Sequence, residues 1–184
     1  MRTKGLPALT NSLGLLLVMV VSCGSAIVGA VDRVVSPQAT SKGAVNRSIQ
    51  RIITETLKEG EGVVNGVKVW RRVPPARKNI EEIRRYGDEA VSALTNRLNA
   101  ESDRERALVV EFLGLLGGRR IIAPLQTVIQ RDDSPSIRIL ALRWITQAPF
   151  SLVSPIIREA SRTDVDPGVR EEAQKILRLP RPND

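Results

Sequence analysis

Histidine is absent from this chain of 184 residues, and Cys23 is its one cysteine. The lack of histidine excludes an imidazole base, and a single cysteine excludes both an intramolecular disulfide and a Cys/His zinc site. Aromatic residues make up only 3% of the sequence, against 42% for all hydrophobic residues. Leu, Ile, Val and Ala therefore supply most of the apolar surface, a balance that suits packed helices better than a β-sandwich.

Catalytic motifs are also missing. Two pairs of adjacent acids occur, Glu81 with Glu82 and Glu171 with Glu172. Neighbouring positions point to different sides of a helix, and Arg or Lys flanks both pairs, so a solvated surface is favoured over acid/base chemistry. No nucleophile motif, phosphate-binding loop or metal-ligand spacing stands out. We therefore expect a protein that is not an enzyme and that needs no cofactor or metal.

The N-terminal segment predicts export. Residues 13–31 carry no charge and follow Arg2 and Lys4, as in a signal peptide or a membrane anchor. Cys23 and its neighbours resemble the lipidation site of bacterial lipoproteins. Small residues within 24–30 suit an ordinary signal peptidase instead, and an uncleaved anchor is the third outcome. All three place the protein outside the cytoplasm, either membrane-anchored or periplasmic or secreted.

A tether, a helix and a hairpin are expected next. Residues 32–43 are rich in Ser, Pro, Gln and Thr without an apolar period, which predicts the tether. Residues 44–58 place apolar side chains at helical spacing, which predicts an amphipathic helix that caps the segments after it. Asn65 and Gly66 lie between valines and have the composition of a two-residue hairpin turn. Trp70 is interpreted as a packing anchor under this turn rather than a ligand platform.

One pattern recurs in the C-terminal half. Asp132, Pro135 and Arg138 are matched 32 residues later by Asp164, Pro167 and Arg170, and Arg106 stands 32 residues before Arg138. A second pattern recurs at a spacing of 31, over residues 86–94, 117–125 and 148–156. Units this short cannot bury an apolar face alone, so they must stack on their neighbours.

The alternation of the two patterns predicts three helical hairpins after a leading half-unit at 80–86. The expected helix pairs are 88–98 with 103–116, 119–131 with 135–147, and 150–162 with 167–178. Overlaying the units makes Phe112, Trp144 and Ile176 equivalent, and we expect them to form a buried seam.

These motifs resemble HEAT repeats. The resemblance rests on a Gly or Pro turn, a small apolar helix such as AVSAL or IIAPL, and Asp-x-x-Pro-x-x-Arg opening the second helix. More narrowly, it is to the short variety also found in phycobilisome lyases, although no residue here identifies a chromophore site. The resemblance implies an all-α fold, a short α-solenoid over residues 80–178, preceded by the segment 44–79 and followed by a tail at 179–184. It also implies a scaffold for protein partners.

Two sets of arginines are candidates for function. Arg106, Arg138 and Arg170 recur in every unit, which favours a structural role, and the resemblance implies that they meet loop aspartates. The second set is a basic contact surface formed by Arg71, Arg72, Arg84, Arg85, Arg119 and Arg120, in a chain of net charge +8. Such a surface suits an acidic peptide, anionic lipid headgroups or an acidic polymer. Nucleic acid is disfavoured because stacking aromatics are nearly absent.

We therefore expect an exported, noncatalytic HEAT-repeat scaffold that binds a protein partner in the bacterial cell envelope. The alternative is an anionic ligand, either lipid headgroups, an acidic polymer or nucleic acid, held on the basic surface. Cys23 or residues 13–31 would tether the protein to a membrane. A stack of three units leaves its ends exposed, so a homodimer or capping by the 44–58 helix is also expected.

Overall fold

Helices dominate the part of the chain that the computed structural model describes, which is residues 37–180, with side chains from Lys42 onward. These residues lie in one unit, Val35–Asp184. Cys23, the rest of the 13–31 stretch and residues 181–184 lie outside the described residues, so export and lipidation stay predictions. Within 37–180, none of the helices combines the length and the apolar character needed to cross a membrane.

The first helix, α1 (Pro37–Gly60), is amphipathic as predicted but longer. It begins at Pro37, so the stretch 37–43 is helical rather than part of a tether, which corrects the expected boundary. Proline is well accommodated in a first helical turn, and Gln, Ala and Lys are good helix formers without an apolar period to reveal them. The stripe formed by Val45, Ile49, Ile52 and Ile53 is buried, and α1 packs against α3 and α4.

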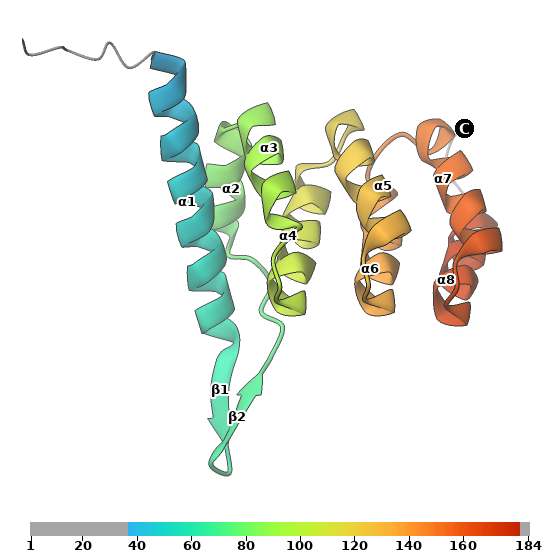
Figure 1. Ribbon diagram of the computed structural model, residues 1–184, viewed down its shortest axis with the longest axis horizontal. Coiled ribbons are helices and arrows are strands. Elements are labelled where there is room, and N and C mark those ends of the chain that lie inside the picture. Colours follow the sequence, from blue (N-terminus) through green and yellow to red (C-terminus); the bar gives the residue numbers. More distant parts are fainter. Residues whose placement is uncertain (1–36, 181–184) are drawn as a thin grey trace, which may run out of the picture. The chain divides into compact units, whose positions relative to one another are not determined.

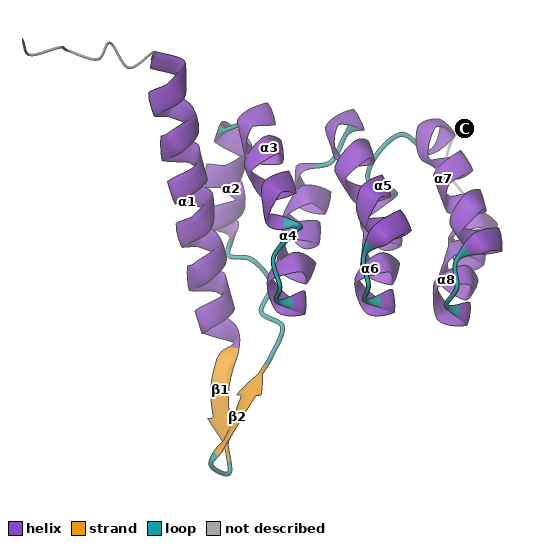
Figure 2. Cartoon of the chain, viewed as in Figure 1, coloured by secondary structure: helices purple, strands orange, loops and turns teal. Residues whose placement is uncertain are grey.

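The predicted hairpin is confirmed. Strands β1 (Glu61–Val64) and β2 (Val67–Trp70) pair antiparallel, with Val64 opposite Val67. Asn65 and Gly66 both have positive φ, 53° and 78°, as the two-residue turn that matches strand twist requires. In Figure 2 the hairpin extends beyond the end of α1 rather than lying on the helices.

The remaining helices are a short one, α2 (Arg77–Arg85), and three antiparallel pairs. The pairs are α3 (Asp88–Arg97) with α4 (Asp103–Leu116), the 3₁₀ turn η1 (Arg119–Ile121) and α5 (Ile122–Arg131) with α6 (Pro135–Ile145), and α7 (Phe150–Thr163) with α8 (Pro167–Arg178). Figure 1 shows the pairs side by side in chain order, and α6 contacts both α4 and α8. The all-α class and the predicted helix pairs are confirmed, with ends shifted by at most a few residues.

The core follows the equivalent positions of the units. Phe112 and Ile176 are buried as predicted, in a continuous apolar cluster. Trp144, their counterpart, is only partly buried, which corrects the expected seam. Its indole lies directly on Gly114 of α4, where a methyl group would overlap the ring. The large ring therefore sits over a helix position without a side chain instead of filling a closed slot.

Candidate binding surface

The repeat arginines form a ladder that joins consecutive loops. Arg106 donates from Nε to Asp132 Oδ2 at 2.9 Å and from Nη2 to Asp132 Oδ1 at 3.3 Å, across 26 residues. Its Nη1 donates to the carbonyl oxygens of Ala100 at 2.9 Å and Glu101 at 3.0 Å, in its own loop. One guanidinium thus fixes its own loop and reaches the next one.

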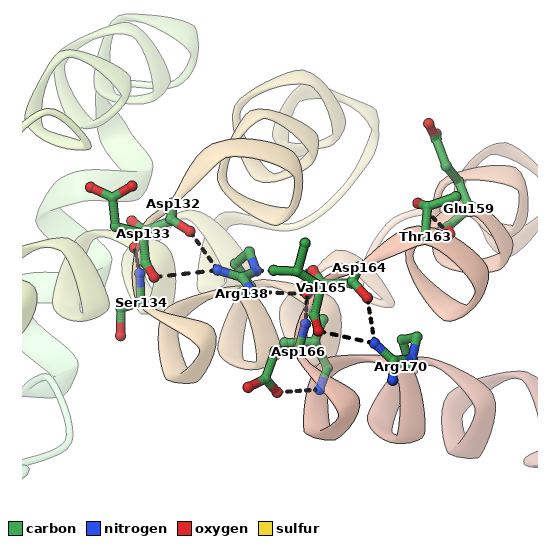
Figure 3. A network of polar contacts seen from close by, with 11 residues as sticks. Asp132, Asp133, Ser134, Arg138, Glu159, Thr163, Asp164, Val165, Asp166 and Arg170 are labelled. Carbon is green, nitrogen blue, oxygen red and sulfur yellow. Dashed lines mark hydrogen bonds and ion pairs between the residues drawn. The ribbon is translucent and has the colours of Figure 1, made fainter.

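The second rung repeats this geometry, as Figure 3 shows. Arg138 binds Asp164 through Nε at 2.9 Å and Nη2 at 2.8 Å, again across 26 residues. Its Nη1 donates to the carbonyl of Asp132 at 2.8 Å. The side chains of Arg138 and Asp164 are only 8% and 7% exposed, so this pair is buried between the units. A buried, bidentate pair of this kind fixes the register of neighbouring units.

The aspartates of the ladder are held by their own loops. Asp132 Oδ1 accepts the backbone N–H of Ser134, and Asp164 Oδ1 accepts that of Asp166, each at 2.9 Å. Burial alone raises the pKa of Asp164. Hydrogen bonds from Arg138 and from the Asp166 backbone, with the charge of Arg138, outweigh burial and hold that pKa below its ordinary value of 3.8.

The six arginines of the predicted basic surface differ in what they contact. Arg84 Nη2 donates to the carbonyl of Leu115 at 3.0 Å, and Arg120 Nη2 donates to that of Leu116 at 3.3 Å. These carbonyls lie at the C-terminal end of α4, which has no basic residue in its own last turn. Both arginines therefore interact favourably with the negative end of the helix dipole. The structure therefore brings Arg84 and Arg120 together, in a role that serves the fold.

The other four basic candidates have different contacts. Arg72 forms an ion pair of 3.0 Å with Glu111, in the middle of α4. The side chains of Arg71, Arg85 and Arg119 are exposed and make no hydrogen bond or ion pair with the described residues. Two of the six arginines thus bind carbonyls at the end of α4, one pairs with an acid, and three are unpaired within the described residues.

A trough of about 370 Å³ lies between the hairpin and the second helices of two units. Apolar and aromatic side chains line it, from Trp70, Ala107, Ile137, Ile139 and Leu140. Its polar lining comes from Arg72, Asp103, Arg104, Ser134, Ser136 and Arg143. The trough thus combines an apolar floor with an aromatic ring and three arginines, and aromatic and arginine side chains are enriched in protein interfaces.

Trp70 and Arg104 form the wall of this trough nearest the hairpin. The Arg104 guanidinium stacks over the Trp70 ring, 5.4 Å from its centroid, a cation–π contact. The base of the hairpin holds the indole in place, since a Cβ at Gly60 would lie 2.5 Å from Trp70 Nε1. Trp70 is therefore a packing anchor, as predicted, and also part of a candidate site.

Arg104 is the cation of the trough that is left without an acid. Arg72 is paired with Glu111, and Arg143 donates to Glu172 from Nε at 2.7 Å and Nη2 at 3.2 Å. Among the described residues, Arg104 has no carboxylate within ion-pair distance. Its charge is therefore available to an incoming acidic group.

Sequence reasoning missed Arg104, Ile139 and Leu140 as site residues. One indication was present: Ile139 and Leu140 stand where the next unit has Glu171 and Glu172. Apolar side chains at positions that are acidic in the next unit indicate a covered surface on the middle unit. The contribution of Trp70 depends on where the hairpin turns back toward α4, which spacing alone does not predict.

Within residues 37–180, no group of Cys, Asp and Glu side chains is arranged to hold a metal ion. Comparison of the chain with protein-family models, with curated proteins and with solved structures finds no match. Function is therefore inferred from the contacts, burial and charges of this chain alone.

Proposed function

We propose that this protein is an exported, noncatalytic HEAT-like repeat scaffold that binds a protein partner in the cell envelope. The repeat part of the proposal is supported by the ladder, because the same arginine–aspartate contact recurs at a spacing of 26 residues between stacked helix pairs. The envelope part is supported by the uncharged stretch 13–31 with Cys23. On this proposal α1 covers the first unit as a cap, since it packs on α3 and α4.

The trough is the observation that carries the proposed activity. Its floor is apolar, and Arg104 stacked on Trp70 leaves a cation free on its rim. Tryptophan and arginine are the residues most often found at energetic centres of protein interfaces. The occupant that fits is a peptide segment with apolar side chains and at least one carboxylate.

The hairpin enlarges this surface. Val63, Val64 and Val67 are 66%, 58% and 63% exposed. Three exposed valines on one short hairpin are unusual for a surface that meets only water. On our proposal Val63 contacts the same partner beside the trough, because it lies on the same face of the two strands as Trp70, whereas Val64 and Val67 lie on the opposite face.

The test is capture of the tagged full-length chain from source cells after chemical crosslinking. Wild type is compared with Arg104→Glu, which reverses the free charge of the trough. Arg162→Glu is the matched control, because Arg162 is exposed on α7 and has no ion pair within the described residues. Binding of each variant to vesicles of phosphatidylglycerol is measured in parallel.

We expect one protein to be enriched with wild type and with Arg162→Glu, and to be lost with Arg104→Glu. Reversing the charge of the unpaired cation in a small interface should weaken binding by about tenfold or more. The opposite result would be strong binding to the anionic vesicles with no protein captured, and it would replace the proposal by the anionic-ligand function.

A further inference from the structure

Arg170, the third arginine of the recurring pattern, uses only one side of its guanidinium within the described residues. Arg170 Nη1 donates to the carbonyl oxygens of Asp164 at 2.6 Å and Val165 at 3.1 Å. Arg106 and Arg138 make the same contacts with their own loops and also bind an aspartate of the next loop. Within the described residues no acceptor meets Nε or Nη2 of Arg170. We call these two donors the open rung.

The two filled rungs define what the open rung can bind. In both, the carboxylate of an aspartate takes one hydrogen bond from Nε and one from Nη2 of the arginine. Each aspartate also accepts the backbone N–H two residues later and lies just before a helix, α6 or α8. The fork of donors in a guanidinium matches a carboxylate better than it matches a neutral acceptor.

We propose that the open rung of Arg170 binds an aspartate in a helix-preceding loop of another protein. The guanidinium is already oriented, because its Nη1 bonds hold it as in the filled rungs (Figure 3). A partner therefore meets a preformed donor pair, which reduces the entropy lost on binding.

The loop beside the open rung has a surface suited to a partner. Val165 is 87% exposed, although it lies next to the aspartate and arginine of the ladder. The equivalent residue of the middle unit is Asp133, which is also exposed but charged. An apolar side chain here gives a partner an apolar contact next to the bidentate one.

A second copy of this chain does not supply the missing aspartate by stacking end to end. Arg106 Nη1 bonds the carbonyl of Ala100 as Arg138 Nη1 bonds that of Asp132, so Ala100 holds the aspartate position of the first loop. In addition, α1 packs over the first unit, where Arg51 binds Glu82 of α2. Stacking of two copies end to end therefore does not fill the open rung.

The experiment places the photo-crosslinking residue p-benzoylphenylalanine at Val165 in the full-length chain, expressed in its source cells. This substitution keeps the backbone carbonyl that Arg170 binds. We expect an adduct with another protein, in which the crosslink maps beside an Asp that precedes a helix. Arg170→Gln should lower the yield about tenfold, the effect of losing one charge-assisted, bidentate contact. Arg162→Gln, an exposed arginine of the same unit, should leave it unchanged.

Changing the partner's aspartate to Asn leaves this chain intact, so a lost adduct in that variant cannot come from misfolding here. Arg170→Asp combined with Asp→Arg in the partner should restore the yield. The proposal is overturned by an adduct with a second copy or with residues 181–184, by a yield that Arg170→Gln does not change, or by the absence of any adduct. This contact is separate from the trough, so the test of one proposal can fail while the other proposal stands.

Discussion

At the scale of single residues, each ladder arginine connects two loops through one planar group. Arg138 shows why the residue recurs: lysine could supply a charge, but not parallel bonds to Asp164 together with bonds to the carbonyls of its own loop. The pair is buried, so its contribution depends on both members being present. Removing one member leaves a desolvated charge without a counterion.

Arg138→Gln should therefore lower the free energy of unfolding by about 3 kcal/mol, because Asp164 is left buried and unpaired. Urea unfolding followed by circular dichroism at 222 nm measures the change. Arg158→Gln is the control, since Arg158 is exposed and its side chain forms no ion pair within 37–180, and it should change stability by less than about 0.5 kcal/mol. Equal stabilities of the two variants would mean that the ladder adds nothing.

The ladder also predicts how stability depends on pH. The pKa of Asp164 is lowered in the folded protein, so the folded state binds this proton less readily than the unfolded chain. Its contribution is present above the ordinary value of 3.8 and is lost as the pH falls through the lower, folded pKa. Glu172 adds to this loss, because the hydrogen bond from Arg143 lowers its pKa below the ordinary 4.5.

We expect the urea midpoint to fall as the pH is lowered below about 4, and to fall less steeply in Asp164→Asn. The measurement is a series of unfolding curves at fixed ionic strength. If wild type and Asp164→Asn lose stability in parallel, Asp164 is not the group responsible.

At the scale of elements, the close contact between α4 and α6 requires a glycine on α4. Gly114 lies under the Trp144 ring, and any Cβ there would overlap the indole. Gly114→Ala should thus destabilise the protein by about 1–2 kcal/mol, although alanine is the better helix former. Combining it with Trp144→Leu should recover part of the loss, as a double-mutant cycle in urea would reveal. A stabilised Gly114→Ala variant would show that the ring moves freely.

The hairpin is an element with few contacts to the helices beyond Trp70. Replacing Gly66 by Ala puts a side chain at φ 78° and should disfavour the turn. We expect faster amide hydrogen exchange in residues 61–69, with less than about 0.5 kcal/mol change in global unfolding. A large global effect would mean that the hairpin is part of the folded core.

How well the elements could be predicted depended on periodicity. The helix pairs were accessible because apolar seams recur every 31 or 32 residues, and the hairpin because Asn65 and Gly66 favour positive φ. The start of α1 was missed because residues 37–43 have no apolar stripe. Trp144 was predicted to be buried but is only partly buried, because the alignment of equivalent positions takes no account of side-chain volume.

At the scale of the whole molecule, the trough forms from residues that are far apart in the sequence, so no single sequence motif contains it. The trough joins Trp70 with Arg104 and Ile139, which come from the hairpin and from two units. Several predicted basic residues proved to bind helix ends or nearby acids, as Arg84, Arg120 and Arg72 do. Charge composition indicated a basic protein. Only the fold shows which arginines are paired and that Arg104 has no acid partner among the described residues.

The most direct test of the central proposal is the affinity of the captured partner for three purified forms of the chain, measured by titration calorimetry. The trough predicts that Arg104→Glu raises the Kd by about tenfold or more, while Arg162→Glu keeps it near the wild-type value. Equal Kd values for Arg104→Glu and Arg162→Glu would contradict binding in the trough.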